Sequence, residues 1–139
     1  MQFTPYLSFQ GECREAFETY AVIFGGTVDL MAFSDMPDGA AMELPAEQAG
    51  WIMHAHLGLP DGASLMGADM PPQFGGEPMA GMSVAVTLPD RAEVGRVFEA
   101  LSPDGHVRME VGPTFFSSAF GMLTDRFGTN WMLMAQASA

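Results

Sequence analysis

Two histidines are spaced so that they can act together. His54 and His56 are separated by one residue within an apolar stretch at residues 51–59. Side chains at positions i and i+2 of a strand point to the same face, so the pair can line one cavity or bind one metal ion. No carboxylate or third histidine is spaced in the sequence to complete a metal site with this pair, so hydrogen-bonded polar residues on a half-exposed strand are the simpler interpretation.

Three other residues could take part in chemistry or binding. Cys13 lies in the first turn of a predicted helix, where the dipole can lower a thiol pKa, but no histidine neighbours it and a small filler is the simpler role. Arg126 follows Asp125 in a predicted turn, where it can cap strand ends or anchor an anionic ligand. Phe116 lies in a loop, where a large apolar residue needs a ligand, a subunit or a partner to cover it.

Two common catalytic motifs are missing from the sequence. It contains no serine nucleophile elbow, and its glycine-rich stretches lack the lysine of a phosphate-binding loop.

The elements that must position the candidates occur twice, because two apolar strands joined by a glycine turn appear in each half. Gly62 matches Gly128 and Met66 matches Met132. The whole chain therefore predicts a strand, a helix and three strands, written twice.

The predicted elements follow from apolar periodicity and glycine turns. In the first half they are strands at 3–9, 27–33, 51–59 and 63–68 and a helix at 12–24, whose apolar stripe is Ala16, Phe17, Tyr20, Ala21 and Phe24. In the second half they are a strand at 82–88, a helix opened by Asp90 with the stripe Val94, Val97, Phe98 and Leu101, a strand at 106–111 and a hairpin at 118–136. We expect a single domain, 1–139, with module one at 1–70, a linker at 71–81 and module two at 82–139. Residues 34–50 form a long loop of the kind that often serves as a lid.

Composition excludes several classes of partner. The chain carries 17 acidic and 5 basic residues, a net charge of −12, so it lacks the cationic surface that nucleic acids or anionic membranes require. No apolar run approaches a membrane span and no signal peptide is visible, so we expect a cytoplasmic protein. The 13 methionines could line an adaptable pocket, but core filling is the expected use.

A set of short motifs, taken in their order along the sequence, resembles a known family. They are Tyr6-Leu7-Ser8-Phe9, Gly11-Glu12-Cys13-Arg14-Glu15-Ala16-Phe17, Tyr20, Phe24-Gly25-Gly26, Met53-His54-Ala55, Leu65-Met66 with Asp69, and Asp125-Arg126-Phe127-Gly128 with Trp131. Together they resemble the PhnB-like branch of the glyoxalase/bleomycin resistance/dioxygenase superfamily. The resemblance implies an α+β protein of the vicinal oxygen chelate fold, with two βαβββ modules whose mixed, curved sheets surround a cavity. It also implies a homodimer.

The resemblance does not extend to the superfamily's metal ligands. Metal-dependent members place His and Glu on inward positions of the first and last strands of each module. The matching strands here offer Thr4, Pro5 or Tyr6, then Gly67, then Met82 or Ser83, and finally Met132. None is a good ligand for a divalent metal, so we predict that this metal site is absent and that no cofactor is bound.

Three functions remain open. The favoured one is a metal-independent small-molecule binding protein that holds an apolar or aromatic compound in the cavity of its sheets. His54, His56, Phe116 and Trp131 are then expected to approach one cavity, with Tyr6 and Arg126 as further ligand-binding candidates. The alternatives are a metal-dependent lyase, isomerase or dioxygenase with an unusual ligand set around the histidines, and a dimeric interaction protein without a ligand. Some PhnB-like sequences are described as 3-demethylubiquinone methyltransferases, but no glycine-rich cofactor loop supports methyl transfer here.

Overall fold

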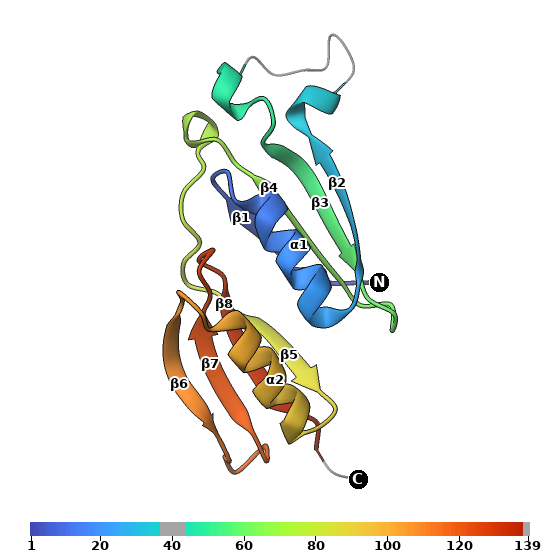
Figure 1. Ribbon diagram of the computed structural model, residues 1–139, viewed down its shortest axis with the longest axis vertical. Helices are drawn as coiled ribbons and strands as arrows, with labels where there is room; N and C mark the ends of the chain where they lie inside the picture. The colour runs from blue at the N-terminus through green and yellow to red at the C-terminus, as the bar shows by residue number, and fades with distance from the viewer. Residues whose placement is uncertain (37–43, 138–139) are drawn as a thin grey trace. The chain divides into compact units, whose positions relative to one another are not determined.

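Two compact units make up the chain, Met1–Met79 and Ala80–Ala139. The computed structural model describes residues 1–36 and 44–137, so part of the predicted loop at 34–50 lies outside the described residues. The first unit contains β1 (Tyr6–Phe9), α1 (Cys13–Phe24), β2 (Thr27–Ala32), β3 (Ile52–Gly58) and β4 (Ser64–Asp69), with short 3₁₀ turns at Phe33–Asp35, Ala46–Gln48 and Pro72–Phe74 (Figure 1). The second contains β5 (Val84–Leu88), α2 (Arg91–Leu101), β6 (His106–Gly112), β7 (Phe120–Thr124) and β8 (Asn130–Ala135). The predicted βαβββ repeat is confirmed.

Each unit forms one mixed, four-stranded sheet. The first sheet has the order β1-β4-β3-β2 and the second has the order β5-β8-β7-β6. In both, only the pair formed by the first and last strands is parallel. The register also repeats, since Leu57 pairs with Leu65 in the first sheet and Leu123 pairs with Trp131 in the second. The duplication read from the sequence therefore extends to the pairing of individual residues.

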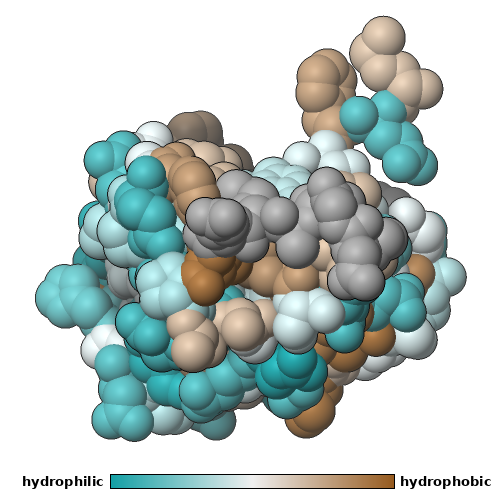
Figure 2. All heavy atoms as spheres, turned by 90° about the horizontal axis from the view of Figure 1, so that it is seen from above, coloured by the Kyte–Doolittle hydropathy of each residue, from teal (hydrophilic) through white to brown (hydrophobic). Residues whose placement is uncertain are grey.

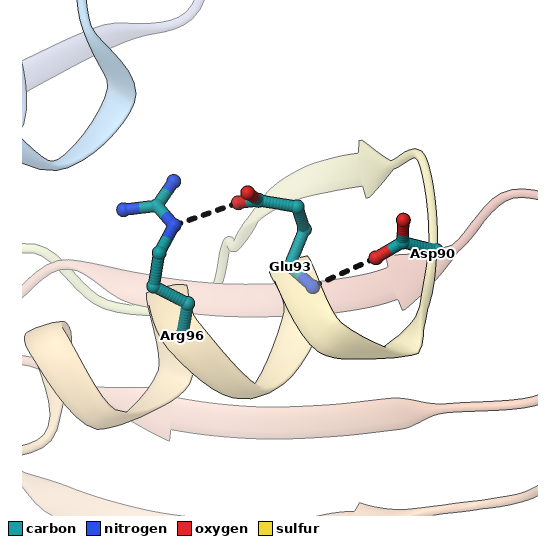
Figure 3. A network of polar contacts seen from close by, with 3 residues as sticks. All are labelled: Asp90, Glu93 and Arg96. Atoms are coloured by element: carbon teal, nitrogen blue, oxygen red, sulfur yellow. Dashed lines mark hydrogen bonds and ion pairs between the residues drawn. The ribbon is translucent and has the colours of Figure 1, made fainter.

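The helices begin and end where local chemistry places their boundaries. Gly25 ends α1 at φ +76°, a left-handed conformation that a residue with a Cβ rarely adopts. At the start of α2, Oδ1 of Asp90 accepts a hydrogen bond of 2.9 Å from the backbone N–H of Glu93 (Figure 3). The Glu93 carboxylate lies 2.7 Å from Nε of Arg96. Asp90 is thus the predicted N-cap of α2.

One face of each sheet packs against the helix of its unit. In α1 the buried residues are Cys13, Ala16, Phe17, Tyr20 and Ile23. The predicted stripe was correct for Ala16, Phe17 and Tyr20, whereas Ala21 and Phe24 are only half-buried. In α2 all four predicted residues are buried: Val94, Val97, Phe98 and Leu101. Among the described residues, no helix has the length and apolar run that crossing a bilayer would take.

A buried carboxylate ties three segments of the first unit together. Asp69, at the end of β4, is 1% exposed. Its Oδ1 accepts hydrogen bonds from the backbone N–H of Gly11 at 2.7 Å and of Cys13 at 3.1 Å, and its Oδ2 accepts one from Ile52 at 2.8 Å. Asp69 therefore takes the place of an N-cap for α1, whose own N-cap residue Glu12 makes no side-chain capping bond.

A second buried carboxylate holds the turn between β7 and β8. Oδ1 of Asp125 accepts hydrogen bonds from the backbone N–H of Phe127 at 2.9 Å and of Thr129 at 3.0 Å. Its Oδ2 accepts the indole N–H of Trp131 at 2.9 Å. Hydrogen bonds to a buried charged acceptor stabilise a fold more than neutral ones do, so these contacts fix the turn firmly.

The methionines of the described residues lie outside the buried core. Among the described residues, the buried apolar side chains include no methionine at all. The expectation that methionine fills the core is therefore wrong. Leu, Val, Ala and aromatic side chains fill the space between helix and sheet, where well-defined rotamers pack densely.

A glycine in each sheet allows the helix to approach. At Gly67 in β4, an added Cβ would lie 2.8 Å from Cε1 of Phe17 and 2.9 Å from the carbonyl oxygen of Leu7. At Gly121 in β7, it would lie 3.0 Å from Cε2 of Phe98. Each glycine thus accepts an aromatic ring from the helix above it.

Replacing Gly67 with alanine should lower the free energy of unfolding by roughly 1–3 kcal/mol, because the added methyl overfills a dense contact. Gly95→Ala is the matched control, since Gly95 lies inside α2 and no atom comes within 4 Å of its added Cβ. That change should stabilise by about 0.8–1 kcal/mol through helix propensity. Urea denaturation followed by circular dichroism measures both, and equal effects of the two changes would contradict the packing.

Candidate functional site

Every strand in the middle of these sheets has one face toward the helix and one face away from it. In the first sheet Leu7, Leu57 and Gly67 point toward α1, as the contact of Gly67 with Phe17 shows. Residues at alternate positions point the other way. We call the side away from the helix the open face of each sheet. Chemistry or binding on these sheets has to use residues of the open faces.

On the first sheet the open face carries polar and thioether side chains in one row. Asp29 pairs with His56, His56 with Met66, and Met66 with Tyr6 across the four strands. His54, two residues before His56, pairs with Met31 on the same face. The predicted common face of the two histidines is thus present, with methionines as their cross-strand neighbours.

Tyr6 and His54 form a direct pair on this face. The phenolic oxygen of Tyr6 lies 3.0 Å from Nδ1 of His54, and the rings stack with centroids 5.7 Å apart. Partial burial raises the pKa of Tyr6, with a smaller contribution from Cys13. A phenol is protonated at neutral pH, so the Tyr6 hydroxyl and the ring nitrogen of His54 can share one hydrogen bond.

On the second sheet the open face has two rows rich in methionine, beside a polar row of His106, Thr124 and Asn130. Met109 pairs with Met122, Met122 with Met132, and Met132 with Ala85. In the next row Phe120 pairs with Met134, and Met134 pairs with Thr87. The methionines are half-buried or, for Met109, 48% exposed. The view in Figure 2, which does not single out this face, has apolar residues among polar ones at the surface.

The structure places Phe116 and Trp131 toward opposite faces of the second sheet. Phe116 packs edge-to-face on Phe120, with centroids 5.1 Å apart, and Phe120 belongs to the open face. Trp131 pairs with Leu123 on the helix side, is 1% exposed and donates its indole N–H to Asp125. This contradicts the expectation that both rings approach one cavity. We leave Trp131 out of the candidate site because it belongs to the core.

Arg126 lies in the turn between β7 and β8, away from the rows of the open face. Its guanidinium sits 4.3 Å from the centroid of the Phe127 ring, a cation–π contact within the turn.

A separate open groove of about 530 Å³ lies between α2 and β6 and is lined by Phe98, Val107, Val111 and neighbouring residues. This groove is on the helix side of the second sheet and not on its open face.

Cys13 is a buried thiol in the first turn of α1. Its side chain is 0% exposed, and burial raises its pKa far above the ordinary value, with the Asp69 carboxylate adding to the shift and Arg14 opposing it. The proximity of the helix N-terminus does not overcome this desolvation. The expected filler role of Cys13 is confirmed.

The described residues contain no group of three or more His, Cys, Asp or Glu side chains that could hold a metal ion. On the second sheet the methionine rows of the open face offer thioethers, which the divalent metals of the superfamily bind poorly. No reaction step through such a metal follows from these residues.

Comparisons with known proteins agree with this architecture. The sequence model described as 3-demethylubiquinone-9 3-methyltransferase matches residues 1–134. The chain belongs to this family. It is a PhnB-like protein, and its family lies within the vicinal oxygen chelate superfamily.

Three solved structures illustrate the likeness. Protein PA1353 from Pseudomonas aeruginosa is 40% identical, with a TM-score of 0.87 and 99% of each chain covered. A putative 3-demethylubiquinone-9 3-methyltransferase, PhnB protein, from Bacillus cereus is 26% identical, with a TM-score of 0.75, 98% of this chain and 100% of the other covered. A glyoxylase/bleomycin resistance protein/dioxygenase domain from Frankia is 14% identical, with a TM-score of 0.65 and coverage of 99% and 98%, and shows the fold alone.

Sequence reasoning overlooked the methionines of the open faces. Met132 and Met134 alternate along β8, and Met122 and Met66 occupy matching apolar strands, so the period-2 spacing could have revealed a shared face. The spacing shows that these methionines share a face of the sheet. It does not show whether the helix covers that face or the opposite one.

The state of Cys13 gives a direct test of the burial described here. Because the raised pKa keeps the thiol protonated at pH 8, a thiol reagent such as DTNB should react with folded protein at least about a hundredfold more slowly than with protein in urea. The rate should not rise across pH 7–9, as it would for an exposed thiol. Rapid reaction of the folded protein would contradict the buried position.

Proposed function

We propose that this protein binds an apolar or aromatic small molecule against the open faces of its sheets, without the help of a divalent metal. The open faces are the places where large side chains are left partly exposed by the fold. A ligand that covers them would remove apolar surface from water, which is the main source of affinity for such sites.

The observation that carries the proposal is the distribution of methionine. Among the described residues methionine is absent from the buried core, yet Met31, Met66, Met109, Met122, Met132 and Met134 lie on the open faces. Methionine has flexible, polarisable side chains that adapt to ligands of irregular shape. This pattern favours a binding surface over a packing role.

The two faces would contribute different interactions. On the first sheet, the pair of Tyr6 and His54 together with His56 supplies hydrogen-bonding groups among apolar neighbours. On the second sheet, Phe116 and Phe120 supply aromatic edges beside the methionines. A few polar groups within a mostly apolar surface are typical of small-molecule sites, where the polar groups orient the ligand.

Divalent metal is not needed for this kind of binding. Hydrogen bonds and apolar contacts suffice, and the thioether-rich surface is a poor host for hard or borderline cations. The family's name supports no further activity here, since shared fold and family do not by themselves establish a reaction.

Binding of the neutral dye Nile red tests the proposal. Met122→Glu should weaken the dye's affinity about tenfold or more, because a carboxylate in the contact surface costs at least about 1.4 kcal/mol of binding free energy. Val22→Glu is the matched control, since Val22 is 84% exposed on α1 and should leave binding unchanged. Fluorescence titration in the presence of EDTA measures both variants.

Two outcomes would overturn the proposal. Equal affinity of the wild type and Met122→Glu would show that the open face of the second sheet is not the binding surface. Loss of binding in EDTA would show that a divalent metal is needed after all. A third result would also count against it: a second copy of the chain could cover the open face. In that case light scattering would show that the wild type is a dimer and that the Met122→Glu variant dissociates, and both proteins would bind Nile red weakly.

A further inference from the structure

We propose that Met109, Met122 and Met132 form a thioether site for a soft monovalent metal ion, such as Cu(I) or Ag(I). This inference goes beyond ligand binding and does not depend on it. It follows from the register of three methionines on the second sheet and from the chemistry of thioethers.

The three methionines occupy neighbouring strands in register. Met132 in β8 pairs with Met122 in β7, and Met122 pairs with Met109 in β6. Cβ atoms of directly paired residues on neighbouring strands are about 5 Å apart. Each methionine has three rotatable side-chain bonds, so the sulfur atoms of the outer two can lean over Met122.

An irregularity in β6 is what brings the third methionine into the row. Val107 pairs with Leu123 on the helix side, and with regular pairing Met109, two residues later, would share that face. The register shifts between Val107 and Met109, so that Met109 pairs with Met122 instead. Such bulges redirect side chains, and here Met109 joins the open face. Val107 and Glu110 line the groove beside α2, whereas Met109 does not.

The surroundings suit a soft ion and exclude a hard one. Thioether sulfur is a soft, neutral donor, which favours Cu(I) over divalent ions that prefer imidazole or carboxylate. The fourth member of the row, Ala85, is small and leaves space beside Met132. The chain's net charge of −12 also favours the approach of a cation.

The duplicated half shows that the row is not a simple product of the repeat. The positions that match Met122 and Met132 in the first sheet are His56 and Met66, and Asp29 stands at the edge where Met109 stands in the second. Only the second sheet, among the described strands, has three thioethers side by side in one row.

Silver titration of protein labelled with ¹³C at the methionine methyl groups tests the inference. Ag(I) is redox-stable and can be added as the nitrate in chloride-free buffer. The methyl resonances of Met109, Met122 and Met132 should shift with about the first equivalent of silver, because their sulfur atoms bind it. Met70 and Met82, which are exposed elsewhere, serve as internal controls and should not shift at that point.

Leucine substitutions separate sulfur ligation from apolar contact. The Met122→Leu/Met132→Leu variant keeps the apolar surface and should lose the silver site, while its circular dichroism spectrum and urea midpoint stay close to those of the wild type. A Cys13→Ala variant should keep the silver site, which excludes the buried thiol as the ligand. Three results would each overturn the inference. The silver-induced shifts could spread evenly over all exposed methionines, or the first equivalent of silver could bind to Cys13 or to the histidines. The double leucine variant could also bind silver as well as the wild type does.

Discussion

A single helix lies on each four-stranded sheet, and it can cover only one of the sheet's two faces. This constraint divides the residues of every central strand into two sets that alternate along the chain. One set, which includes Leu57, Leu133 and Trp131, is buried against α1 or α2. The other set has no helix over it, and its composition is therefore free to differ from that of a core.

Buried carboxylates keep the covered side in place. Asp69 joins the start of α1, the start of β3 and the end of β4, and Asp125 closes the turn that leads to Trp131. These contacts also explain why several of the motifs that carry the family resemblance contain the residues they do. Gly11, Cys13 and Asp69 belong to one hydrogen-bonded unit, and Asp125 and Trp131 belong to another. These recognisable residues are thus structural, whereas Tyr6, His54 and Met66, which also carry the resemblance, lie on the open face.

Much of the fold could be predicted from the sequence because it is encoded locally. The glycine turns, the stripe of α2 and the capping by Asp90 are short-range features, and the matching positions of Met66 and Met132 revealed the repeat. The candidate site was harder to predict. Whether Trp131 or Met132 faces the helix depends on packing that neighbouring residues in the sequence do not reveal, and the bonds of Asp69 to Gly11 span 58 positions. Cys13 shows the same limit, since burial and not the helix dipole sets its pKa.

Each sheet has a side packed on its helix and a proposed binding side, and the most direct test of this division is to locate a bound apolar compound. A crystal structure with 1-bromonaphthalene allows the bromine to be found by anomalous scattering. The account predicts a bromine peak against an open face, in contact with Met122 and Met132 or with Tyr6 and His54. A compound bound only in the groove beside α2, lined by Phe98 and Val107, or inside the core around Trp131, would contradict it.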